Sequence, residues 1–150
     1  SVTSASEMAN RAFTLYPSCN AAVLTAAVAD FTPREKPYQK IKRQAAIWTL
    51  DLEPTVDIAA ELGKLKNTGQ VLAGFALETH DELENARNKL KRKNFDFIIL
   101  NSLNDKGAGF GYDTNKISIL EKDNNIRIFE LKSKKEVAID IVEKLVEYVT

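Results

Sequence analysis

Hydrophobic and polar positions follow two alternating patterns along the 150-residue chain. Short apolar runs bounded by turn residues indicate strands buried on both faces of a sheet. Three runs have this pattern, Ala21–Val28, Gln70–Leu77 and Phe95–Leu100. Ile47–Leu52 alternates in polarity and predicts a strand with one exposed face. We also expect Ser1–Thr3 to be the end of a strand.

Between these runs, apolar residues recur every three or four positions, which predicts four amphipathic helices. Three helices start with a Ser or Thr followed by Glu three residues later, a capping box. The boxes are Ser4 with Glu7, Thr79 with Glu82 and Ser133 with Glu136, and Thr55 starts the remaining helix. Pro17 ends the first helix, and Asn94 can provide a left-handed cap for the third. The expected inner-face residues are Met8, Ala12 and Phe13; Ile58, Ala59 and Leu62; Leu83, Ala86 and Leu90; and Val137, Ile141, Val142 and Leu145.

The carboxyl-terminal third predicts a β-hairpin. Asp123-Asn124-Asn125 separates the apolar runs Ile117–Leu120 and Ile126–Leu131, and the preceding Asn101–Asn115 is a loop rich in Gly, Asn and Asp. Strands that alternate with helices predict an α/β protein with a Rossmann-like, doubly wound, mostly parallel sheet, here closed by the antiparallel hairpin. The chain has no G-x-G-x-x-G and no Walker loop. We therefore expect the carboxyl portion of a single such domain, over residues 1–150, lacking its first βα units.

The overall charge excludes some classes of protein. Twenty-one basic and twenty-one acidic residues cancel, so no global field attracts nucleic acid or a membrane. No apolar run approaches the roughly 20 residues that cross a bilayer. The amino terminus lacks the basic start and apolar core of a signal peptide. Because Cys19 is the only cysteine, the sequence predicts no disulfide framework and favours a reducing, cytoplasmic location.

The stretch Ala21–Lys42 carries the first candidate chemistry. Its apolar run ends at Asp30, and a long loop then leads to Lys40. In open α/β sheets, ligands bind beyond the carboxyl ends of the strands. A carboxylate and an ammonium at this edge suit a metal-bound triphosphate. The alternative is a turn-capping Asp30 and a solvated Lys40, at roughly even odds from position alone because fold does not fix function.

Three other places offer complementary groups. Val56–Ala59 lies at a predicted helix start, where free N–H groups and the helix dipole favour an anion. Phe75 lies near a strand end, where it could flank a base, although a core aromatic explains the pattern better. Lys89 and Lys93 share one helical face, but cations near a helix C-terminus are favoured by the dipole without any ligand.

Six segments together resemble one enzyme family. They are AAVADFTP, KIKR at Lys40–Arg43, TVDIAAELG at Thr55–Gly63, GFALET at Gly74–Thr79, NARNKLKRKNFDFIILN at Asn85–Asn101, and GAGFGYDTN at Gly107–Asn115. Their order and spacing resemble phosphopantothenoylcysteine synthetase, also called phosphopantothenate–cysteine ligase. In most bacteria that enzyme of coenzyme A biosynthesis is fused behind a flavin-dependent decarboxylase.

The resemblance implies a reaction and a set of residues. The bacterial enzymes use CTP with Mg²⁺, form an acyl-cytidylate from 4'-phosphopantothenate, and join it to cysteine. The implied catalytic residues are Lys40, Ala26 and Ala27, with Asp30 meeting the metal. The implied nucleotide-binding residues are Leu24, Thr25, Ala26, Asp30, Lys40, Val56, Asp57, Ile58, Ala59, Phe75, Lys89 and Lys93.

The resemblance also implies partners and leaves alternatives open. It implies a homodimer in which the Thr32–Ala46 flap, with Lys40 and Lys42, reaches the other subunit. FMN is expected only if a decarboxylase domain lies upstream. One alternative is a non-catalytic nucleotide-binding or dimerising fragment. A Rossmann-type oxidoreductase shares the predicted fold, but the absence of G-x-G-x-x-G counts against it.

Overall fold

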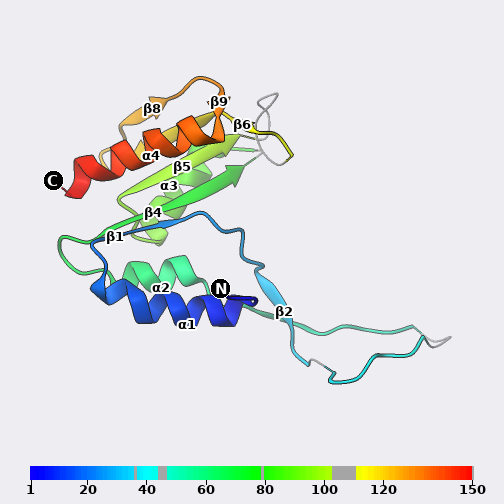
Figure 1. Cartoon of the computed structure of the whole chain (residues 1–150). Helices are drawn as coiled ribbons and strands as arrows, with labels where there is room; N and C mark the ends of the chain where they lie inside the picture. Colours follow the sequence, from blue (N-terminus) through cyan, green and yellow to red (C-terminus); the bar gives the residue numbers. More distant parts are fainter. Residues whose placement is uncertain (36, 44–46, 79, 103–110, 150) are drawn as a thin grey trace.

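A five-stranded sheet lies between helices in the computed structural model, which describes all residues except 36, 44–46, 79, 103–110 and 150 (Figure 1). Its strand order is β1-β4-β5-β7-β8. Strands β1, β4 and β5 run parallel, and β7 and β8 add an antiparallel hairpin. The strands are β1 (Ala21–Leu24), β4 (Val71–Glu78), β5 (Phe97–Ser102), β7 (Ile117–Glu121) and β8 (Ile126–Ile128). The predicted α/β class with a closing hairpin is confirmed.

Alternate side chains of the sheet form two separate cores, as the period of two in a strand requires. Leu72 and Ile98 pack into the core shared with α1, α2 and α3. Their neighbours Ala73 and Ile99 pack into the core under α4. Figure 1 shows α1 and α2 side by side below the sheet and α4 above it. The helices are α1 (Ala5–Leu15), α2 (Ile58–Leu65), α3 (Glu82–Arg92) and α4 (Lys134–Val149).

Two predicted helix starts are confirmed by their hydrogen bonds. The Glu7 N–H donates to Ser4 Oγ over 3.2 Å, while the Glu7 carboxylate accepts from Thr3. Before α4, the Ser133 N–H donates to Glu136 Oε2 over 2.9 Å, and the Glu136 N–H donates back to Ser133 Oγ over 3.2 Å. These side chains satisfy N–H groups that the first helical turn leaves without a partner.

The first strands differ from the prediction. Ser1–Thr3 forms no strand, and the ladder of β1 ends at Leu24 instead of Val28. All four residues of β1 are half-buried, because β1 pairs with β4 alone among the described strands and lies at the sheet edge. The expectation that this run is buried on both faces was therefore wrong.

The Ile47–Leu52 strand was also placed incorrectly. Instead, β2 (Phe31–Pro33) pairs with β3 (Leu52–Pro54) in antiparallel register. The sequence had predicted that the residues of β2 belong to a loop. The chain between them forms an arm that projects away from the sheet (Figure 1). Ile47 is 98% exposed, so the apolar residues of this alternating segment do not pack against a sheet. The described part of the predicted flap is thus a two-stranded stalk followed by chain that forms neither helix nor strand.

Helices α2 and α3 begin later than predicted. Helix α2 begins at Ile58 instead of Thr55, because the Asp57 carboxylate caps it by accepting the Ala60 N–H. Helix α3 begins at Glu82 after Asp81, which has φ 46°. Thr79 lies outside the described residues. Asn94 has φ 51°, so the predicted left-handed cap is confirmed.

Two predicted inner-face residues point to solvent. Leu83 and Val142 are 42% and 57% exposed. In α4, Lys144 is buried instead, because its ammonium pairs with Glu121 over 2.6 Å and with Glu147 over 2.8 Å. Burial lowers the pKa of Lys144, but these carboxylates outweigh burial and raise it above its ordinary value.

A second, two-stranded sheet forms from the segments on either side of the β7–β8 hairpin. Strand β6 (Thr114–Asn115) pairs with β9 (Lys132–Ser133), two short strands that the sequence did not predict. Most of the predicted Asn101–Asn115 loop lies outside the described residues. In the part of the chain that is described, no helix has the length and apolar content needed to cross a membrane.

Asp96 anchors the end of the sheet opposite to the one where β1 and β4 end. Its carboxylate accepts hydrogen bonds from Lys66, Lys122 and the Leu72 N–H, each between 2.8 and 2.9 Å. Burial raises the pKa of Asp96, but these donors outweigh it and hold the pKa below the ordinary 3.8. The carboxylate therefore stabilises the fold above about pH 4, and this contribution is lost as pH falls through the lowered pKa.

We expect Asp96→Asn to lower the free energy of unfolding by about 2–4 kcal/mol at pH 7, because Lys66 is left buried without its counter-charge. Urea melts at pH 7 and pH 3 measure this. The difference from wild type should be smaller at pH 3 than at pH 7, because the contribution of the carboxylate is lost as pH falls through its lowered pKa. The exposed Glu143→Gln is the matched control. An unchanged midpoint for Asp96→Asn at pH 7 would contradict this role.

Candidate active site

A cleft of about 190 Å³ opens at the carboxyl ends of β1 and β4, beside the N-terminus of α2 and the C-terminus of α3. It gathers segments that are far apart in the sequence. All predicted nucleotide-binding residues except Thr25 and Lys40 line it. The lining residues are Met8, Leu24, Ala26, Val28, Ala29, Asp30, Thr55, Val56, Asp57, Ile58, Ala59, Gly74, Phe75, Lys89, Lys93 and Phe95.

Thr55 fixes the segment that carries Asp30. Its hydroxyl donates to the Ala29 carbonyl over 2.5 Å, and its N–H donates to the Asp30 carbonyl over 2.9 Å. These two bonds join the chain leaving β1 to the chain entering α2. Asp30 lines the cleft and is exposed, so its side chain is open to a ligand while the two bonds from Thr55 hold its backbone.

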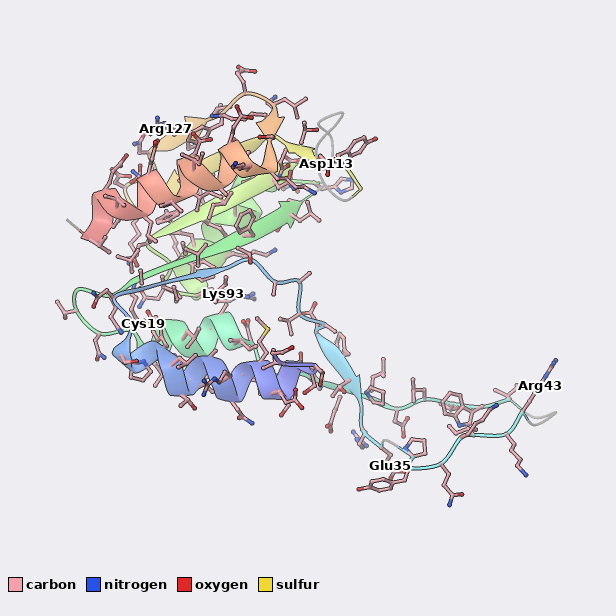
Figure 2. The ribbon with its side chains drawn as sticks, viewed as in Figure 1. Cys19, Glu35, Arg43, Lys93, Asp113 and Arg127 are labelled. Atoms are coloured by element: carbon pink, nitrogen blue, oxygen red, sulfur yellow. The ribbon has the colours of Figure 1, made fainter. Side chains whose placement is uncertain are left out.

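Asp57 occupies the N-terminus of α2. Its Oδ1 accepts the Ala60 N–H over 3.1 Å and the Lys93 ammonium over 2.9 Å. Burial raises the pKa of Asp57, but Lys93 and Ala60 outweigh burial and hold it below its ordinary value. Figure 2 shows Lys93 between the sheet and the layer of α1 and α2. Asp57 thus supplies an internal negative charge to the helix end and places the Lys93 ammonium in the cleft.

Lys89 is held by a second carboxylate. Its ammonium lies 2.5 Å from Glu78 Oε1, and the Lys89 side chain keeps 36% of its surface exposed. The Asn85 amide donates to the His80 carbonyl over 2.9 Å, which ties the start of α3 to the segment after β4. Since Lys89 and Lys93 are one helical turn apart, both ammonium groups face the same cleft.

Gly74 allows an aromatic wall to form. A Cβ at Gly74 would lie 2.4 Å from the Phe95 ring, so a larger residue would displace that ring. Phe95 is 3% exposed, whereas Phe75 is half-buried and contributes to the cleft. This combination offers a flat apolar surface beside two ammonium groups, which suits a base or ribose next to phosphates.

Three predicted residues lie elsewhere. Thr25 and Ala27 line a second pocket on the other side of β1, because alternate residues of an extended chain face opposite ways. Lys40 is exposed on the arm between β2 and β3. Figure 2 shows Glu35 and Arg43, which flank Lys40 in sequence, on the arm and far from Lys93. The structure therefore does not bring Lys40 to the cleft of its own chain.

Sequence reasoning missed several contributors. Thr55 was taken only as a helix start, and Met8 only as part of an apolar stripe, yet both line the cleft. Glu78 was within a quoted motif but had no role, although it holds Lys89. The sequence did carry a signal for Glu78, because it is a carboxylate at the carboxyl end of a buried strand, where ligands bind in such sheets.

The charged side chains that line the cleft suit an anion that carries its own metal ion better than an anion without one. The two ammonium groups of Lys89 and Lys93 already face Glu78 and Asp57. Among the described residues, no group of three or more His, Cys, Asp or Glu side chains is placed to hold a metal by itself. A single open carboxylate, Asp30, fits Mg²⁺, which is usually bound by one or two carboxylates together with substrate phosphates.

The fold and the cleft define a class: an α/β protein with a charged cleft beyond the carboxyl ends of its parallel strands. The family can be named from comparison with known proteins. The family model for the DNA/pantothenate metabolism flavoprotein C-terminal domain matches residues 1–149. The chain belongs to this family, and its domain resembles phosphopantothenoylcysteine synthetase.

Named relatives are longer proteins. The chain is 42% identical over 144 residues to the coenzyme A biosynthesis bifunctional protein CoaBC of Bacillus subtilis, covering 96% of this chain and 35% of the relative. It is 55% identical over 148 residues to a protein named cysteine/cysteine sulfinic acid decarboxylase from an unknown prokaryotic organism, covering 99% of this chain and 41% of that protein. The chain thus spans well under half the length of these curated relatives.

Solved structures support the fold. The crystal structure of the C-terminal domain of a CoaBC protein matches with TM-score 0.77 and 36% identity, over 97% of this chain and 65% of that one. The DNA/pantothenate metabolism flavoprotein from Streptococcus pneumoniae matches with TM-score 0.78 and 20% identity, over 98% of this chain and 71% of that one. These comparisons favour neither an oxidoreductase nor a non-catalytic fragment.

Proposed function

We propose that this chain is the carboxyl portion of a phosphopantothenate–cysteine ligase domain that acts in coenzyme A biosynthesis with CTP. The observation that carries the proposal is the single cleft that joins Asp30, the start of α2, Phe75 and the two lysines of α3. Family membership and the CoaBC relatives support the same reaction.

The reaction has two steps. A carboxylate oxygen of 4'-phosphopantothenate attacks the α-phosphorus of CTP, and the bond to the leaving pyrophosphate breaks. The amine of cysteine then attacks the activated carbonyl carbon, an amide forms, CMP leaves, and the amine releases a proton. The protein's task in both steps is to position the reactants and neutralise charge.

The residues have distinct roles in this proposal. Lys89 and Lys93 neutralise phosphate oxygens, and Phe75 flanks the base or ribose. The small Ala26 and Ala27 leave room at the reacting centre for the substrate carboxylate. Asp30 would hold Mg²⁺, which supplies further neutralisation of the triphosphate when bound.

Activity is tested in the full-length protein with CTP, Mg²⁺, 4'-phosphopantothenate and cysteine. We expect pyrophosphate release that depends on phosphopantothenate and CMP release that depends on cysteine. Omitting each reactant in turn gives the controls. Release of carbon dioxide from cysteine, without pyrophosphate, would instead match the activity named for the prokaryotic relative. Absence of pyrophosphate release would contradict the ligase assignment.

We further propose that the protein is a homodimer whose arms cross to the partner's cleft. The arm exposes large apolar side chains: Phe31 at 59%, Tyr38 at 106%, Ile47 at 98% and Trp48 at 63%. Monomers rarely leave such a set in water, so a second copy of the chain is the partner that fits. This arrangement would also bring Lys40 to a cleft that it does not reach in its own chain.

Light scattering at tens of micromolar, on the order of ordinary dimer affinities, tests the assembly. We expect the wild type to have the mass of a dimer and Ile47→Asp with Trp48→Asp to shift it toward monomer, because charge on the arm opposes burial. Ile128→Asp is the control, since Ile128 is 69% exposed on β8 and away from the arm. A monomeric wild type would overturn the proposed dimer.

A further inference from the structure

Glu78 is a charged side chain beside the candidate active site that the proposed function does not use. It is the last residue of β4 and pairs with Ser102 of β5 in the ladder, so the sheet fixes its backbone. Its side chain is only 14% exposed, and its Oε1 lies 2.5 Å from the Lys89 ammonium. The Asn85 amide of α3 lies 3.5 Å from the other carboxylate oxygen. The carboxylate therefore has a fixed place between β4 and α3.

Lys89 lies between two hollows. It lines the cleft described above, and it also lines another hollow of about 290 Å³, which we call the α3 hollow. The other residues of the α3 hollow are Glu78, Asn85, Asn88 and Arg92. Since Glu78 lines the α3 hollow and not the cleft, it holds the Lys89 ammonium without filling the space for a nucleotide.

The ion pair with Glu78 restricts the freedom that the fold leaves to Lys89. Ala86 and Leu90 are buried on the inner face of α3, so the helix backbone under Lys89 is already fixed. The flexible four-carbon stem of a lysine would otherwise let its ammonium move between both hollows and the surrounding water. An ammonium has three N–H donors, so one bond to Glu78 leaves donors for phosphate oxygens. A cation that is held in advance loses less freedom when an anion binds.

We infer that Glu78 is a positioning residue, which fixes the Lys89 ammonium for the phosphates of the nucleotide. The inference rests on the proposed function. It requires that Glu78 acts on nucleotide binding through Lys89 and through the reach of its side chain. The alternative role is a counter-charge that only lowers the positive charge at the cleft, and that role depends on the charge of Glu78 and not on its reach.

Glu78→Asp separates these roles, because it keeps the charge and shortens the side chain by one methylene group. Calorimetry with CTP and Mg²⁺ in the full-length protein measures the effect. We expect the affinity for CTP to fall about tenfold in Glu78→Asp and at least as much in Lys89→Met, with no further loss in the double variant. Glu84→Asp is the matched control, because Glu84 is exposed on the same helix and lines neither hollow.

The double variant also excludes a merely structural role. A general loosening of the fold would weaken binding by the same factor with and without Lys89, whereas a positioning role disappears when Lys89 is absent. Steady-state pyrophosphate release gives a second measurement. The KM for CTP should rise in Glu78→Asp while the KM for cysteine stays unchanged, a split that partial unfolding would not produce.

Two results overturn the inference while the wild type still binds CTP and the proposed function stands. Wild-type affinity in Glu78→Asp would show that reach does not matter. Losses that multiply in the double variant would show that Glu78 acts independently of Lys89. Titration with tripolyphosphate in parallel covers failure of the proposed function. A wild type that binds tripolyphosphate but not CTP contradicts the nucleotide assignment, and the same variants then test Glu78 on the polyphosphate. Binding of neither anion overturns both.

Discussion

Replacing Lys40 by glutamine is expected to abolish acyl-cytidylate formation and to weaken CTP binding, while the fold persists. The reason is the charge of the cleft. Lys89 and Lys93 already pair with Glu78 and Asp57, so neutralising a triphosphate requires positive charge beyond these two ammonium groups. Removing a group that stabilises charge in the transition state typically costs at least about a hundredfold in turnover. Pyrophosphate release in the full-length protein measures the effect.

Lys42→Gln is the matched control, because both lysines are exposed on the same arm. It should retain far more activity than Lys40→Gln. Equal melting temperatures without ligand would verify that neither variant unfolds. Unchanged CTP affinity and turnover in Lys40→Gln would remove Lys40 from the mechanism.

Mixed dimers decide which subunit Lys40 serves. If the arm serves the partner's cleft, co-expressed Lys40→Gln and Lys89→Gln chains form some dimers with one intact site. Random pairing of equal amounts then restores about a quarter of wild-type activity, because half of the dimers are mixed and each has one of two sites intact. If Lys40 serves its own cleft, each site of a mixed dimer keeps one defect and activity does not return.

CTP is expected to stabilise the protein clearly more than ATP does when Mg²⁺ is present. The cleft is small, about 190 Å³, and lined by Ala26, Ala29 and Ala59 next to Phe75, so a pyrimidine fits better than a purine. Cytosine also offers an amino donor and a carbonyl acceptor that backbone groups near Ala29–Phe31 and Ile58–Ala59 can read. A site built on paired hydrogen bonds rejects a wrong base because its own polar groups are left unsatisfied.

A melting series with CTP, ATP, GTP and UTP at equal concentration makes the measurement. At about 100 times the dissociation constant, CTP should raise the melting temperature by about 5 to 10 °C. UTP is the matched control, since it has the size of CTP and a different base edge. Equal shifts for CTP and ATP would mean that only the triphosphate is recognised, and the CTP assignment would be withdrawn.

Several local features were predictable because they depend on neighbours in the sequence. The Ser133 and Glu136 capping box formed as predicted, since its partners are three residues apart. The central strand β4 lies within one residue of its predicted bounds, because a long apolar run has few alternatives. The order of the elements then implied the parallel sheet with its closing hairpin.

Other features depended on residues far away in the chain. Val142 and Lys144 lie on one helix, yet the valine is exposed and the lysine is buried, where it pairs with Glu121 of the distant strand β7. The apolar run after Leu24 has no strand partner among the described residues, so it leaves the ladder. No periodicity along the sequence reveals which strands pair or which carboxylate a lysine will find.

The sequence by itself determined the four helices, the central strands, the α/β class and the resemblance that named the cleft residues, because periodicity, caps and motif spacing are local properties. Only the tertiary structure decided which of those residues meet. It gathered Asp30, Asp57, Phe75, Lys89 and Lys93 in one cleft because parallel strands end at the same edge of the sheet. It separated Ala27 from that cleft because alternate residues of an extended chain face opposite sides, and it placed Lys40 on an arm that leaves its own domain.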